Sequence, residues 1–373
     1  MRPSPTFSRA MVMLTLAWGL VVSPAAPGLL AAQLDATPAA SPAPAEQPAS
    51  LLDATRSPAL AWQTEVGDTL GSAPAIAAGM VFVGSAEGNL LALDAHDGTR
   101  RWTFAAGARI AAPPAVDAGT VYIGTTSGTV YAIDMVTGHE HWRAITGGAI
   151  RSAPVIAAGR LYVASGDGAL YAFAAASGDP LWRFYTVGSI PGGPATAGDA
   201  VFVPSAGGTL YALNPVTGQI FWTTVTGTEF NHAPAIAGER VILGDNSGLL
   251  RAFDAHTGSV RWERDMGAAV ITAPAVADGM VVVGTSERTL AAVGTDNGVL
   301  RWTTDLVARP VGSPVVAGAL IRLADGQPAL RAFAADSGEP RWQVTGIGPA
   351  TASPVVAGGA VFIAGLDGIV YAL

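Results

Sequence analysis

Residues 120–142 read TVYIGTTSGTVYAIDMVTGHEHW, and this stretch decides the fold because its pattern returns every forty residues along the chain. It holds two β-branched and aromatic runs, Thr120–Gly124 and Thr129–Ile133, which are separated by a Ser-Gly turn, and it ends at Trp142. A fixed period of this size is the signature of a repeat architecture. Eight tryptophans share the final position, with no residue gained or lost between them: Trp62, Trp102, Trp142, Trp182, Trp222, Trp262, Trp302 and Trp342.

Other residue types keep the same period. A proline follows each tryptophan by twelve residues, and an alanine follows it by thirty. A glycine precedes seven of the tryptophans by four residues, and glycine suits a turn whose backbone needs a positive φ. Because no interval changes in length, no repeat carries an inserted lid, an extra loop or a second domain.

Each repeat is predicted to form four short antiparallel strands. Between Trp102 and Trp142, the apolar stretch Arg109–Ala118 precedes the two runs described above, and a fourth run opens at His141. Short runs bounded by glycine, aspartate or serine are typical of strands, and no window shows the apolar spacing of a helix. Four strands in roughly 40 residues indicate one blade of a β-propeller. We therefore predict an all-β, eight-bladed propeller of four-stranded antiparallel blades over residues 54–373.

The two ends of the repeat region are predicted to share one blade. Residues 367–373 resemble the third strand of the first repeat, Gly88–Leu93, whereas Ala59–Trp62 reads as a fourth strand with no blade before it. The N-terminal strand would then complete the last blade and close the ring, so that no sheet edge is left unpaired at the seam. We expect the tryptophans to wedge between blades, with the ring buried and its N–H on a backbone carbonyl.

The first part of the chain resembles an export segment. Residues 1–32 begin with two arginines, continue with an uncharged apolar run at 10–22 and then turn to small residues, which predicts a secretory signal peptide. An uncleaved membrane anchor is the alternative, because 10–32 carries no charge and is long enough to span a bilayer. Residues 33–53 are rich in Ala, Pro, Ser and Thr and read as a linker. No twin-arginine pair is present, so we expect the general secretory route and an extracytoplasmic location.

The composition excludes several classes of function. The chain has no cysteine, which rules out disulfides, iron–sulfur clusters, thiolate metal sites and a lipidated cysteine anchor. Its net charge is −8, and without residues 1–32 the 18 arginines face 28 acids, so that 18 − 28 = −10. This balance disfavours nucleic acid as a partner, since that affinity comes largely from neutralising phosphates. We expect a monomer that contacts a membrane only if residues 1–32 are retained.

Candidate binding residues lie where the repeat pattern turns polar. In a propeller, the loop that leads into the first strand of each blade opens at the mouth of the central channel, and the loop between the second and third strands opens on the same face. The first loop lies six to ten residues after each tryptophan and is mostly Gly, Ala, Ser or Ile. The polar exceptions are Arg109, Arg151, Arg309, Glu229, Asn231 and His232, joined in the fifth unit by Asp245 and Asn246 of the second loop.

Two interpretations of these residues stay open. Arginines at the mouth would pair with a carboxylate or phosphate in a forked geometry, and His232 and Asn231 would orient a polar ligand. Alternatively, a channel mouth is wet and tolerates polar residues without any function. Glu229, Asn231 and Asp245 offer the oxygen ligands that calcium prefers, but no metal-loop spacing supports a site. We predict no metal site and find no nucleophile–base pair for catalysis.

The block before each tryptophan resembles a known docking motif, A-x-D-x-x-T-G-x-x-x-W of the pyrroloquinoline quinone (PQQ) repeat. The similarity is weaker at 174–178 and 294–298, but it extends to every unit, and it identifies the chain as a member of the quinoprotein-like eight-bladed propeller family. The clearest blocks are ALDAHDGTRRW (92–102), AIDMVTGHEHW (132–142), ALNPVTGQIFW (212–222) and AFDAHTGSVRW (252–262).

This resemblance implies a function as well as a fold. Dehydrogenases of the family are longer, with insertions, a vicinal-cysteine disulfide and a Glu/Asn/Asp set on calcium; no catalytic residue of this kind carries over here. The compact, exported form is similar to the non-catalytic, BamB-like branch. We therefore expect a scaffold or sensor that binds a protein or peptide in the cell envelope and uses no cofactor. The alternatives are a PQQ- and calcium-dependent dehydrogenase reduced to its bare propeller, and a module for a sugar or small anion at the channel mouth.

Overall fold

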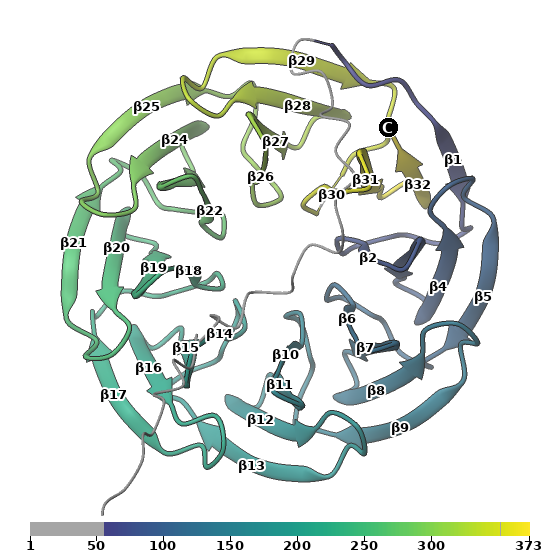
Figure 1. Cartoon of the computed structure of the whole chain (residues 1–373), viewed down its shortest axis with the longest axis horizontal. Coiled ribbons are helices and arrows are strands. Elements are labelled where there is room, and N and C mark those ends of the chain that lie inside the picture. The colour runs from purple at the N-terminus through teal and green to yellow at the C-terminus, as the bar shows by residue number, and fades with distance from the viewer. Residues whose placement is uncertain (1–55, 351) are drawn as a thin grey trace, which may run out of the picture. The chain divides into compact units, whose positions relative to one another are not determined.

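The computed structural model describes residues 56–350 and 352–373, which form eight four-stranded antiparallel sheets and no helix. The sheets surround a central axis as blades, with the first strand of each blade innermost and the fourth on the rim (Figure 1). The predicted eight-bladed propeller is thus confirmed. The predicted signal segment 1–32 and linker 33–53 lie outside the described residues. Within the described part of the chain, no helix could cross a membrane.

The strands of blades 1 to 4 are β2 (Ala75–Ala77), β3 (Met80–Gly84), β4 (Asn89–Asp94) and β5 (Arg100–Ala105); β6 (Ala115–Asp117), β7 (Thr120–Gly124), β8 (Thr129–Asp134) and β9 (Glu140–Ile145); β10 (Val155–Ala157), β11 (Arg160–Ala164), β12 (Ala169–Ala174) and β13 (Pro180–Tyr185); β14 (Ala195–Ala197), β15 (Ala200–Pro204), β16 (Thr209–Leu213) and β17 (Ile220–Val225).

The strands of blades 5 to 8 are β18 (Ala235–Ala237), β19 (Arg240–Gly244), β20 (Leu249–Asp254) and β21 (Val260–Asp265); β22 (Ala275–Ala277), β23 (Met280–Gly284), β24 (Thr289–Gly294) and β25 (Leu300–Asp305); β26 (Val315–Ala317), β27 (Leu320–Ala324), β28 (Ala329–Ala334) and β29 (Pro340–Thr345); β30 (Val355–Ala357), β31 (Ala360–Ala364), β32 (Ile369–Ala372) and β1 (Trp62–Glu65).

Blade 8 joins the two ends of the repeat region, as the sequence predicts. β1 pairs antiparallel with β32, with Trp62 opposite Ala372 and Glu65 opposite Ile369. On the channel side, β30 of blade 8 contacts β2 of blade 1. The ring is therefore closed by strand pairing and by packing of the inner strands.

The hydrophobic core lies between blades rather than within one blade. Phe82 and Leu90 of blade 1 are fully buried and pack in one cluster with Val121 of blade 2. This follows from second and third strands that are apolar on nearly every residue, because both of their faces are covered. On the fourth strands, burial alternates, since only one face packs inward. The repeated alanine lies opposite the tryptophan in the ladder, as Ala132 does opposite Trp142.

Each tryptophan links its blade to the next one. Trp102 Nε1 donates a hydrogen bond to the Met135 carbonyl of blade 2 at 3.1 Å. The Trp102 ring lies over Gly138, where a Cβ would come within 2.7 Å of a ring carbon, and Gly138 has φ 74°. Glycine is thus required both by the turn and by the close approach of the ring. The same bond, 33 residues along the chain, is made by Trp62, Trp142, Trp182, Trp222, Trp262 and Trp302.

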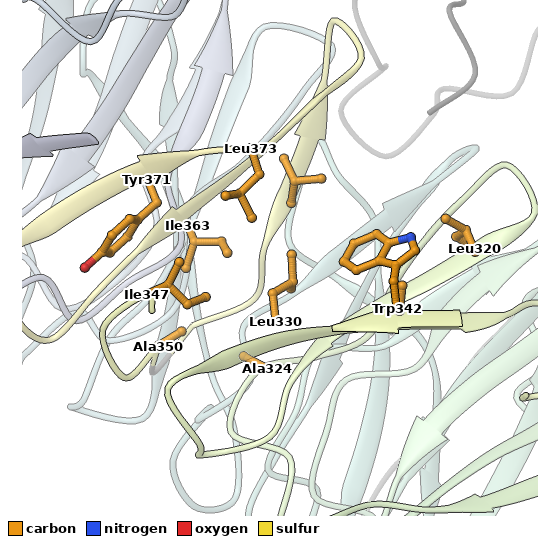
Figure 2. Packing of buried hydrophobic residues seen from close by; sticks show 11 residues of the cluster. Leu320, Ala324, Leu330, Trp342, Ile347, Ala350, Ile363, Tyr371 and Leu373 are labelled. Carbon is orange, nitrogen blue, oxygen red and sulfur yellow. The ribbon is translucent and has the colours of Figure 1, made fainter. Parts of the chain in front are cut away.

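Trp342, next to the seam, is the exception. Its ring packs in a cluster with Leu320, Leu330 and Leu373 (Figure 2), but its buried Nε1 has no hydrogen-bond partner among the described residues. Elsewhere the acceptor lies in the turn that joins the third and fourth strands of the next blade. In blade 8 those strands are β32 and β1, which are not consecutive in the chain. Among the described residues, Trp342 is thus the one interblade tryptophan whose Nε1 lacks this hydrogen bond.

Candidate functional site

Two neighbouring loops form the polar corner of blade 5. The loop that contains Glu229 leads into β18, and the loop that contains Asn246 connects β19 to β20. Asn246 Nδ2 donates to Glu229 Oε2 at 3.0 Å, and the Asn246 N–H donates to the Glu229 carbonyl at 3.3 Å. Both residues are exposed, so the pair presents a carboxylate and an amide to solvent.

Asp245 lies beside this pair but is buried, with 1% of its surface exposed. Its Oδ2 accepts the Thr228 hydroxyl at 2.5 Å and pairs with the buried Arg251, while its Oδ1 accepts the Ser247 hydroxyl at 2.6 Å. Burial by itself would raise the pKa of the Asp245 carboxyl, but hydrogen bonds led by those from Ser247 and Thr228 hold that pKa below its usual value. The carboxylate is therefore ionised, and both of its oxygens are bound by side chains of the same blade.

Asn231 and His232 follow Glu229 along the chain and are partly buried. Burial lowers the pKa of His232, so its imidazole is neutral at neutral pH and offers one donor and one acceptor. The backbone here is held against blade 4, since a Cβ on Gly192 would lie 2.0 Å from the His232 carbonyl carbon. This corner can hydrogen-bond a polar ligand, but the Glu229 carboxylate opposes an anionic one.

The three arginines of the candidate set lie on the equivalent loops of other blades. Arg109 leads into blade 2, Arg151 into blade 3 and Arg309 into blade 7, and all three are exposed. Arg109 Nη2 lies 3.3 Å from the position of a Cβ on Gly71, so its guanidinium packs beside the backbone of the preceding loop. Blades 8 and 1 separate Arg309 from Arg109 around the ring. The structure therefore spreads the arginines around the mouth and does not gather them at the blade 5 corner.

The oxygen set of Glu229, Asn231 and Asp245 does not fit a calcium ion. Both Asp245 oxygens already accept hydrogen bonds, and one of them pairs with Arg251. Residues 56–350 and 352–373 contain no group of three or more His, Cys, Asp or Glu side chains placed to hold a metal. We derive no chemical step through calcium or a quinone.

Two arginines that are not among the predicted site residues pair with buried aspartates, Arg251 in blade 5 and Arg331 in blade 7. Arg251 Nε donates to Glu263 at 2.5 Å while its Nη1 reaches Asp245. In blade 7, Arg331 Nε makes the corresponding bond to the fully buried Asp325 at 2.6 Å. These pairs could be found by comparing the repeats. Blades 3 and 4 have serine where blades 5 and 7 have the aspartate, and tyrosine where they have the arginine.

Comparison with known proteins places the chain among the PQQ repeats. It matches the family described as outer membrane protein assembly factor BamB over residues 52–112, 100–190, 181–272 and 246–373. A comparison with curated proteins gives no match.

Three solved structures share the fold. BamB from Moraxella catarrhalis superposes with a TM-score of 0.73 at 20% identity, covering 83% of this chain and 99% of that one. A computationally designed protein, Ika8, gives 0.75 at 17% identity over 84% and 98% of the two chains. A europium-containing methanol dehydrogenase gives 0.73 at 14% identity over 82% and 84%. At these identities, the structures establish the fold alone. Because the family match runs through every blade, the chain belongs to the PQQ-repeat family described as outer membrane protein assembly factor BamB.

Proposed function

We propose that this protein is an exported, non-catalytic propeller that binds an extended segment of a partner protein along the rim of blade 4. The observation that carries the proposal is the surface of β17, the outer strand of that blade. Ile220, Phe221 and Val225 are 50%, 52% and 72% exposed. No charged residue occurs between Asp199 and Glu229. This rim is therefore both apolar and uncharged.

The other outer strands of the propeller each carry at least one charged side chain. β21, the equivalent strand of blade 5, carries Arg261, Glu263 and Asp265. Charged side chains on an edge strand normally prevent another chain from pairing with it, because the edge presents free N–H and C=O groups. β17 is the edge of its sheet and has no such protection. An unprotected edge with exposed apolar side chains is the surface to which an extended peptide adds as a further strand.

Apolar side chains are also exposed on the rims of blades 3 and 2. Leu181 and Tyr185 on β13 are 46% and 55% exposed, and Ile145 at the end of β9 is 77% exposed. Exposed apolar surface that extends over neighbouring elements is typical of an interaction site. Membership of a family described as an outer membrane protein assembly factor supports a partner protein in the cell envelope, where the predicted export signal would deliver the chain. No cofactor or reaction is part of the proposal.

The experiment compares β17 of blade 4 with β21 of blade 5 and places two of the charged residues of β21 at the equivalent positions of β17. In cells that express the full chain, a photo-crosslinking amino acid is placed at Phe221 and, as the matched control, at Arg261. We expect a protein adduct from position 221 and none from 261. The double variant Phe221→Arg/Val225→Asp, which copies the blade 5 residues, should lose co-purification of the crosslinked partner while its melting temperature is unchanged. Equal adducts at both positions, or a partner retained by the double variant, would contradict the proposal.

A further inference from the structure

In blades 1 and 5, the turn before the tryptophan is held by an aspartate with two roles. Asp254 Oδ1 of blade 5 accepts the N–H of Thr257 at 2.8 Å, and its Oδ2 pairs with Arg261. Asp94 of blade 1 pairs in the same way with Arg101, at 2.5 Å. The carboxylate thus neutralises an arginine on the outer strand and caps the turn.

Blades 6 and 7 keep the arginine and lack the acid. Arg301 and Arg341 occupy the arginine position, where the sequence has Gly294 and Ala334 in place of the aspartate. The two residues that replace the acid are buried, as Asp254 is in blade 5.

The other blades that lack the aspartate also lack the arginine. Blade 3 combines Ala174 with Leu181, and blade 4 combines Asn214 with Phe221. Asn214 Oδ1 still caps its turn by accepting the Val216 N–H at 2.8 Å. Retention of a cation without its acid therefore distinguishes blades 6 and 7 among the seven turns that the structure describes.

The two arginines have only weak replacements for the missing partner. Arg301 Nη2 donates to the Gly279 carbonyl at 2.8 Å, which is a neutral acceptor. Arg341 approaches Glu339 at 3.6 Å, and the glutamate side chain is 69% exposed. An exposed pair at this distance contributes little. Both guanidinium groups keep donors for a further carboxylate.

Both arginines line the same pocket, of about 520 Å³, between blades 6 and 7. Ala334 and Met280 contribute apolar walls, and the acidic residues of the lining are Asp278 and Asp336. A pocket of this size is in the range that holds a small molecule. Two arginines and two aspartates give a lining with no net charge, which suits a molecule that carries both signs better than a polyanion.

We propose that this pocket binds the carboxylate of a small zwitterion, an α-amino acid or the C-terminal residue of a short peptide. The ligand carboxylate takes the position that Asp254 holds in blade 5, between the Arg341 guanidinium and the turn at Ala334. The ligand ammonium group lies toward Asp278 and Asp336. A carboxylate held by a guanidinium and by backbone N–H groups is a strong, charge-assisted arrangement.

Isothermal titration of the full chain tests this assignment with three sets of probes. These are a panel of L-amino acids, the corresponding amino-acid amides, and dipeptides with free or amidated C-termini. We expect saturable binding of at least one free amino acid or free dipeptide, and loss of binding when the carboxylate is amidated. Comparing the free amino acids with the free dipeptides shows whether the carboxylate comes from an amino acid or from the C-terminus of a peptide.

Two variants with a matched control locate the site. Arg341→Ala, at an exposed position, should weaken binding about tenfold or more. Ala334→Asp rebuilds the blade 5 pairing inside the protein and should abolish binding without lowering the melting temperature. Ala174→Asp in blade 3, where no arginine is present, should leave binding unchanged. The assignment is overturned if no probe binds, if amides bind as well as free carboxylates, or if Arg341→Ala retains full affinity.

Discussion

Blades 5 and 7 both replace the serine and tyrosine of blades 3 and 4 with a buried aspartate–arginine pair, but only blade 5 surrounds its arginine with acids. Arg251 of blade 5 reaches Glu263 in addition to its aspartate, whereas Arg331 of blade 7 reaches the uncharged Gln343. The same substitution in the repeat therefore has a different electrostatic setting in each blade. Stability should depend on the neighbours of a buried charge more than on the charge itself.

The two blades differ again near the tryptophan. Ile242 of blade 5 is fully buried in the interblade core, and the same repeat position in blade 7 is Arg322, which is 2% exposed. Burial lowers the pKa of Arg322, and its Nε has no partner among the described residues. The guanidinium lies 6.0 Å from the ring of Trp342, whose Nε1 is also unpartnered. Blade 7 thus contains two buried donors that blade 5 avoids.

The largest expected effect comes from removing the buried acid in each blade. Asp325→Ala should lower the free energy of unfolding by about 3–5 kcal/mol, because it leaves Arg331 with no charged partner. Asp245→Ala should cost less, because Glu263 still pairs with Arg251 at 2.5 Å. Denaturant unfolding of the two variants measures the difference. Equal losses, or a larger loss in Asp245→Ala, would show that the hydrogen bonds of Asp245 to Thr228 and Ser247 outweigh the remaining pair of Arg251 with Glu263.

The next effect is a gain of stability. Arg322→Ile copies blade 5 and removes a buried guanidinium with an unsatisfied donor, so we expect the free energy of unfolding to rise by about 1–3 kcal/mol. The reciprocal change, Ile242→Arg, is the control and should be destabilising. A loss of stability in Arg322→Ile would mean that the contact of Arg322 with Trp342 outweighs its burial.

A smaller difference in stability is expected between the phenylalanine variants of Trp262 in blade 5 and Trp342 in blade 7. Trp262→Phe removes the hydrogen bond to the Thr295 carbonyl, at 2.8 Å, and leaves that acceptor unsatisfied. Trp342→Phe removes a donor that has no partner. Both lose similar ring area, so Trp262→Phe should be the more destabilising by about 1 kcal/mol. Thermal unfolding at one pH compares the two variants, and an identical shift would argue against a role of the N–H in joining blades.

The smallest effect depends on pH. The hydrogen bond from Arg261 and those from the turn hold the pKa of Asp254 well below its usual value, against the opposing effect of burial. Because its pKa is lower in the folded than in the unfolded chain, the Asp254 carboxylate stabilises the fold fully at pH values above the unfolded pKa of about 4. This stabilisation is lost as the pH falls from there toward the folded pKa. Asp254→Asn should therefore lose less stability than the wild type between about pH 5 and pH 3. The difference should stay below about 1 kcal/mol, since Arg261 is half exposed. A steeper acid loss in the variant would reverse this sign.

The fold could be predicted because its determinants repeat. The tryptophan spacing predicts the blade count. The strand predicted at Ala59–Trp62, which the structure places at Trp62–Glu65, predicts the closure, so both follow from local pattern. The candidate site is harder to predict from the sequence than the fold, because its residues are the ones that depart from the repeat pattern. Asp245 reads as a ligand-binding residue from its loop position alone. Its partner Arg251 becomes visible only when blade 5 is compared with blade 7, where Asp325 changes together with its own arginine.

The closing strand also bears on the order of folding. Trp62 and Thr64 of β1 bond to Ala95 and Gly98 of blade 1, only 33 and 34 residues further on. These short-range contacts can form as soon as blade 1 exists, before the last repeat is available. When β32 later pairs with β1, β1 is already held against blade 1. Less conformational entropy is then lost in this pairing than if β1 were a free tail. We therefore expect the contacts of Trp62 with blade 1 to form before β1 pairs with β32, which is the pairing most distant in the sequence.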